Sequence, residues 1–62
     1  MSMKTVQIEY AVVSPAVLER VVQRVFPNSF ISWKDVCEDY FEFTVIGVKD
    51  LASLENILAK YV

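Results

Sequence analysis

The sequence contains no histidine, one cysteine, one glycine and two prolines among its 62 residues. Catalysis near neutral pH usually uses histidine, a tuned pair of carboxylates, an activated nucleophile or a metal. A single glycine excludes a glycine-rich phosphate-binding loop. The one thiol, Cys37, lies among acidic residues, which disfavour the reactive thiolate. We therefore expect a protein that is not an enzyme and that uses neither a cofactor nor a metal.

Charge and hydropathy narrow the class of protein further. Six basic and eight acidic side chains give a net charge of −2, whereas proteins that bind nucleic acid normally present a basic face. No apolar run approaches the roughly 20 residues needed to span a bilayer, and no secretory signal begins the chain. One cysteine cannot form an internal disulfide, which favours a reducing compartment. With 55% apolar residues, the chain is expected to form a single domain over residues 1–62 in the cytoplasm, or in the host cytoplasm if the protein is viral.

Two segments with different periodicities begin the chain. Residues 4–13 alternate between apolar and polar, which is the period of a half-buried strand. Its apolar side is expected to hold Val6, Ile8, Tyr10 and Val12. Ser14 and Pro15 then favour a helix start, because serine caps the first turn and proline suits its first position. The helix that follows is expected to end at Pro27 and Asn28, with an apolar stripe of Leu18, Val21, Val22 and Val25.

The middle of the chain predicts a β-hairpin formed by residues 30–37 and 40–46. A three-residue loop between them places Lys34 opposite Glu42, whereas a loop one residue shorter places Asp35 opposite Glu42. Opposed like charges destabilise a sheet and opposite charges stabilise it, so the three-residue loop is favoured. We expect the last residue of this loop, Asp39, to adopt a left-handed conformation.

The aromatic residues of this hairpin have two interpretations. The run Tyr40–Val45 is similar to the aromatic strand of RNA-recognition domains, in which two rings face outward and stack on bases. That arrangement requires Phe41 and Phe43 outside and lacks the basic flanks that attract phosphate. We therefore expect Trp33, Phe41 and Phe43 to lie in the core.

The acidic residues around the hairpin turn lack the loop length and glycine of a calcium-binding EF-hand and are expected to be solvated.

Asp50 is a good N-cap for a second helix, whose apolar face is expected to consist of Leu51, Leu54, Ile57, Leu58 and Tyr61. The order of elements is then βαββα, an α+β two-layer sandwich with two helices on one face of a three-stranded sheet. This order resembles a ferredoxin-like βαββαβ domain that lacks its last strand. The resemblance implies that the third strand lies between the first and second, which are then parallel to each other.

The candidate interaction surface is a sheet edge and a sheet face. The first strand would lie at an edge without proline, and Thr5, Gln7, Glu9 and Ala11 are its candidate contact residues. Two copies could pair these strands about a two-fold axis into a six-stranded sheet. The alternative dimer packs the open sheet faces together through Val36, Tyr40 and Ile46. Phe30, Val13 and Val48 are also expected on the open face or at its ends.

Three functional hypotheses remain after this reasoning. The first is a non-enzymatic protein-interaction module, a homodimer that serves as a small regulator or inhibitor of a protein partner. Small acidic single-domain proteins of this type are common among phage-encoded proteins that block host or defence factors. The analogy with those proteins is one of composition only. The second is a small-molecule sensor, because βαββαβ domains of the amino-acid-binding type hold ligands between paired sheets. The third is a structural subunit of a larger assembly.

Overall fold

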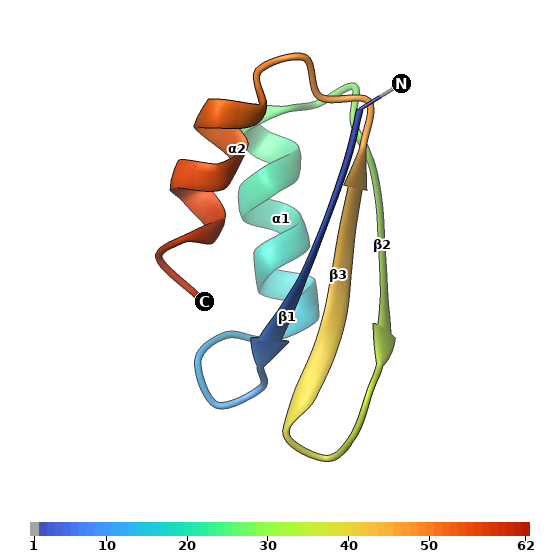
Figure 1. The fold of residues 1–62 in the computed structure, drawn as a ribbon, viewed down its shortest axis with the longest axis vertical. Coiled ribbons are helices and arrows are strands. Elements are labelled where there is room, and N and C mark those ends of the chain that lie inside the picture. The colour runs from blue at the N-terminus through green and yellow to red at the C-terminus, as the bar shows by residue number, and fades with distance from the viewer. Residues whose placement is uncertain (1) are drawn as a thin grey trace.

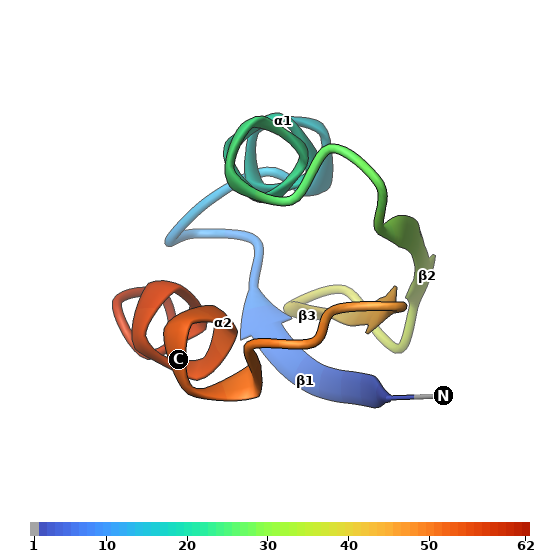
Figure 2. The same cartoon turned by 90° about the horizontal axis from the view of Figure 1, so that it is seen from above.

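The computed structural model describes residues 2–62 as a two-layer α+β sandwich. Its elements in chain order are β1 (Met3–Glu9), α1 (Pro15–Val25), β2 (Phe30–Asp35), β3 (Tyr40–Ile46) and α2 (Leu51–Leu58). Both helices lie on the same side of one three-stranded sheet, and the other side of the sheet is open (Figures 1 and 2). The expected fold class and element order are confirmed. Neither helix in the described residues is long and apolar enough to cross a membrane.

The strands lie in the order β1-β3-β2, as the ferredoxin-like resemblance implies. Both outer strands are antiparallel to β3 and therefore parallel to each other. Lys34 pairs with Glu42 and Trp33 with Phe43, which is the register of the three-residue loop. The prediction for Asp39 is wrong, because Gly47 alone has a positive φ among the described residues. The hairpin closes instead through the N–H groups of Val36 and Cys37, which both donate to the Tyr40 carbonyl.

The core lies between the helices and the inner side of β3. Phe41, Phe43 and Val45 alternate along this strand and are buried, because β3 has a neighbour on each side and helices above it. The Phe41 and Phe43 rings meet edge to face with centroids 6.4 Å apart. The other buried apolar residues come from every remaining element except β2: Ile8, Leu18, Val22, Val48, Leu54 and Leu58. The predicted apolar faces of the two helices thus supply four of the nine core residues.

Five apolar residues do not lie where the sequence pattern predicts them. β1 ends at Glu9, four residues early, because Val12 N–H donates to the Glu9 carbonyl in a turn that leaves Val12 exposed. Val25, in the last turn of α1, is also exposed. Trp33 is 44% exposed because it lies on the outer strand β2, which itself ends two residues early at Asp35. Val48 and Val13 are expected on the open face or at its ends, but Val48 is buried in the core and Val13 packs against the core.

Both predicted helix starts are confirmed. The Ser14 hydroxyl accepts a hydrogen bond from Val17 N–H at 3.3 Å, and Pro15 is the first helical residue. At α2, Asp50 accepts the Ser53 N–H at 3.1 Å and the Ser53 hydroxyl at 2.6 Å. The bond from Ser53 N–H satisfies one of the backbone N–H groups that the first turn of a helix leaves unpaired.

The Asp50 cap predicts a pH-dependent contribution to stability. The Ser53 hydroxyl, and after it the Ser53 N–H, holds the pKa of Asp50 below its ordinary value. A carboxylate whose pKa is lower in the folded state stabilises the fold fully above the unfolded pKa, which is about 3.9 for aspartate. This stabilisation is lost as the pH falls through the folded pKa. Asp50→Asn keeps a cap acceptor but cannot titrate, so its melting temperature should lie below that of the wild type at about pH 7, and the difference should shrink as the pH falls below about 3.9.

Thermal unfolding followed by circular dichroism at each pH measures this difference. Asp39→Asn is the control, because the structure shows no hydrogen bond to the Asp39 side chain. A melting-temperature difference between the wild type and Asp50→Asn that stays constant with pH would contradict the assignment.

Candidate functional site

The outer edge of β1 presents unpaired backbone groups. At its two ends, Tyr10 N–H donates to the Asp39 carbonyl at 2.9 Å and Gly47 N–H donates to the Ser2 carbonyl at 3.0 Å. These bonds fix the even-numbered residues of β1 as those that exchange hydrogen bonds with β3, because backbone groups alternate between the two sides of a strand. No strand in residues 2–62 pairs with the other side. The residues whose N–H groups point outward are Met3, Thr5, Gln7 and Glu9.

The two edges of the sheet differ in how they are protected against pairing. On β2, Asp35 lies on the helix-facing side opposite Phe41, and an inward-pointing charge on an edge strand blocks the addition of another strand. On β1, the helix-facing charge is Lys4, whose ammonium lies 3.4 Å from the Glu55 carboxylate of α2. This ion pair gives the Lys4 ammonium a partner of opposite charge on α2. Neither edge strand contains proline, so the two edges differ in their inward charge: Lys4 has a partner on α2, whereas no salt bridge to Asp35 is found within residues 2–62, and we take β1 as the less protected edge.

A groove runs beside β1 and beneath α2. Its volume is about 400 Å³, and its lining residues are Lys4, Val6, Glu55, Leu58, Ala59 and Val62. Figure 2 shows α2 on the β1 side of the molecule, so this groove occupies the place beside β1 where a βαββαβ domain carries its fourth strand. Val62 at its rim is 77% exposed. An apolar groove thus adjoins a row of unpaired backbone groups.

On the open face of the sheet, the strand register arranges side chains of similar polarity in rows across the three strands. An apolar row crosses one end, where Met3 and Phe30 flank Ile46 and are 64% and 67% exposed. The next two rows are polar: the Thr5 and Thr44 hydroxyls lie 3.1 Å apart, and the Lys34 ammonium lies 3.6 Å from the Glu42 carboxylate. Glu9, Tyr40 and Val36 lie at the hairpin end. The polar rows in the middle separate the two apolar ends.

The predicted contact residues therefore fall into three separate places. Thr5, Gln7 and Glu9 lie exposed along the β1 edge, and Ala11 lies in the turn after β1. Val36 and Tyr40 are exposed at the hairpin end, whereas Ile46 is half-buried at the opposite end. Sequence reasoning did not include Met3, although the alternation of β1 extends to it. It also missed the groove residues Val6, Leu58, Ala59 and Val62, because folding brings these together from two segments about 50 residues apart.

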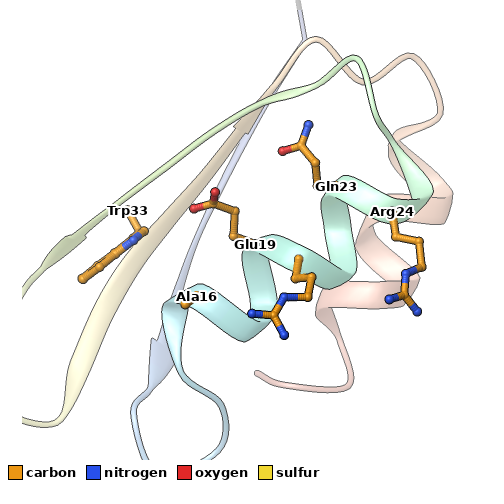
Figure 3. Close-up of a pocket in the computed structure, with 6 residues that line it drawn as sticks. Ala16, Glu19, Gln23, Arg24 and Trp33 are labelled. Carbon is orange, nitrogen blue, oxygen red and sulfur yellow. The ribbon is translucent and has the colours of Figure 1, made fainter.

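A second and larger groove separates α1 from β2. It has a volume of about 620 Å³, and its lining residues are Ala16, Glu19, Arg20, Gln23, Arg24 and Trp33. In Figure 3, Trp33 and Glu19 border the space between the strand and the helix, and Arg24 points away from Trp33. The Gln23 amide already donates to the carbonyls of Pro27 and Ser29. The groove is therefore wide and open, and few of its polar groups converge on one point.

The described residues offer little reactive chemistry. No group of three or more histidine, cysteine or acidic side chains within residues 2–62 is arranged to hold a metal ion. Cys37 is a free, exposed thiol near the hairpin turn. Comparison with known proteins adds no family assignment: no protein-family model, curated protein or solved structure matches the chain. The surfaces described above are therefore the features of the molecule that bear on its function.

Tyr10 carries the one buried side-chain polar atom in residues 2–62 that lacks a hydrogen-bond partner. Its ring packs on Phe41 with centroids 5.1 Å apart, and neither of the two grooves described above includes it. A buried unpaired hydroxyl costs stability, on the order of 1 kcal/mol or more. Tyr10→Phe should therefore leave the free energy of unfolding unchanged or raise it by about 1 kcal/mol, as measured by urea denaturation. A loss of more than about 1 kcal/mol would show that the hydroxyl makes a stabilising bond.

Proposed function

We propose that the protein is a non-enzymatic interaction module, a small regulator or inhibitor that acts by binding a protein partner along the edge of β1. The observation that carries this proposal is the combination of the outward backbone groups on the less protected sheet edge with the apolar groove beneath α2. Strand addition at a sheet edge draws its affinity from main-chain hydrogen bonds and its specificity from pockets that receive alternate side chains. The edge of β1 supplies the main-chain hydrogen bonds, and the groove supplies the pocket for side chains.

An incoming strand would meet two different environments. Its side chains on the helix-facing side would enter the groove, where they would contact Val6, Leu58 and Ala59. Its side chains on the open face would continue the polar rows that begin at Thr5 and Gln7. This arrangement favours a partner strand that alternates between apolar and polar residues. The proposal places the protein in the cytoplasm, where its exposed Cys37 would stay reduced.

A small-molecule sensor is the second candidate, and the groove between α1 and β2 is the observation that favours it. The groove offers an aromatic ring, Trp33, and the carboxylate of Glu19. A screen of metabolites by thermal shift tests this candidate, and Trp33→Ala is its matched variant. A ligand that stabilises the wild type by several degrees and does not stabilise Trp33→Ala would favour the sensor over the interaction module.

The interaction module is tested by affinity capture with three versions of the protein as bait. Gln7→Pro removes an outward-facing N–H of β1, and Asp35→Pro removes an outward-facing N–H of β2. We expect the wild type and Asp35→Pro to retain the same protein from a lysate of the source organism, and Gln7→Pro to lose it. With the captured protein purified, the affinity of Gln7→Pro should be at least tenfold weaker, because both the donor and the room for a neighbouring strand are lost.

Circular dichroism and tryptophan fluorescence check that both proline variants are folded. Capture that is equal for all three baits, or no protein retained above a bead control, would contradict the proposal. A partner that binds in several copies per complex would instead favour a structural subunit.

A further inference from the structure

We infer that a second copy of this chain occupies the β1 edge, with the two β1 strands antiparallel about a two-fold axis that passes beside Val6. This inference rests on the proposed use of the β1 edge and names the occupant of that edge when no partner protein is bound, so that the second copy and the partner compete for it. The result would be a continuous six-stranded sheet with helices on one side, formed from two three-stranded sheets. A contact of this symmetry must be self-complementary, since the same strand supplies both sides.

The register follows from the length and the outward groups of β1. With the axis beside Val6, Met3 pairs with the partner's Glu9 and Thr5 pairs with the partner's Gln7, so all seven residues of β1 are used. Every pair that must exchange hydrogen bonds then joins two odd-numbered residues, which are those with outward backbone groups. The Glu9 carbonyl also accepts Val12 N–H, and a carbonyl has a second lone pair for the partner.

Neighbouring registers are less favourable. An axis beside Thr5 pairs only five residues and places Lys4 opposite the partner's Val6. The two Lys4 side chains then become diagonal neighbours on one side of the sheet, which is unfavourable for like charges. An axis beside Gln7 also pairs only five residues and places Lys4 opposite the partner's Tyr10, which lies beyond the end of β1. The register beside Val6 avoids both problems and separates like charges along the strands.

The groove beneath α2 supports the same axis. Val6 is the middle residue of β1 and lines the groove together with Leu58, Ala59 and Val62. In the inferred register the two Val6 residues form a non-hydrogen-bonded pair, the kind in which side chains come closest together. The apolar linings of both grooves would then meet at the two-fold axis. Val62, which is 77% exposed in the single chain, would gain apolar neighbours there.

The oligomeric state of the purified protein tests the inference. Light scattering across micromolar concentrations should show a dimer for the wild type and for Asp35→Pro, and a monomer for Gln7→Pro, with dimer affinity lowered at least tenfold. A monomeric wild type would overturn the inference. A dimer that survives Gln7→Pro but not Ile46→Glu would also overturn it, in favour of packing between the open sheet faces.

Single-cysteine variants read the register without relying on proline. In a Cys37→Ser background, Val6→Cys, Thr5→Cys and Gln7→Cys are oxidised mildly at low concentration, and the covalent dimer is measured on a non-reducing gel. A non-hydrogen-bonded pair has a Cα separation of about 4.5 Å, within the range that a disulfide spans. Val6→Cys should cross-link at least tenfold faster than the other two variants. Faster cross-linking of Thr5→Cys or Gln7→Cys would overturn the register beside Val6.

The two proposals fail in different ways. A monomeric wild type that still captures a partner, and loses it in Gln7→Pro, would overturn self-pairing while the interaction module stands. A dimer that Gln7→Pro disrupts, with no partner captured by any bait, would overturn the proposed regulator while self-pairing stands.

Discussion

The burial of Phe41, Phe43 and Val45 between the helices and the sheet is the contact on which the rest of the structure depends. These residues alternate along β3, which has a hydrogen-bonded neighbour on each side, so their positions fix the orientation of all three strands. A domain of about 60 residues buries only about 60% of its unfolded surface and is marginally stable. Since this chain has no disulfide to add stability, the helix-facing side of its central strand must be completely covered.

Local sequence patterns predicted the elements well because local chemistry determines them. The pairing of Lys34 with Glu42 identified the hairpin register, and Ser14 and Asp50 identified both helix starts. The pattern failed at Trp33 and Val12. Alternation shows which side of a strand a residue faces, but it does not show whether a helix covers that side or where a turn ends the strand. Trp33 faces the helices and is still exposed, because β2 is an outer strand.

The candidate site, like the fold, could be predicted from the sequence only in part. The outward residues of β1, Thr5 and Gln7, followed from the alternation and the expected strand order. The groove beside them did not, because Leu58, Ala59 and Val62 lie about 50 residues further along the chain and reach β1 only through the packing of α2. Conversely, the residues predicted to form one open face, Val36, Tyr40 and Ile46, lie at opposite ends of the sheet. The edge with its groove is the place where backbone and side-chain features coincide.

Asymmetry between the two sheet edges is the central claim, and amide hydrogen exchange measures it directly. The outward amides of β1 include Thr5, Gln7 and Glu9, and those of β2 are Ile31, Trp33 and Asp35. Exchange followed by NMR at increasing protein concentration should slow at the three β1 amides, because a second strand then covers them, and stay fast at the three β2 amides. Fast exchange at both edges at every concentration, or equal slowing at both, would contradict the account.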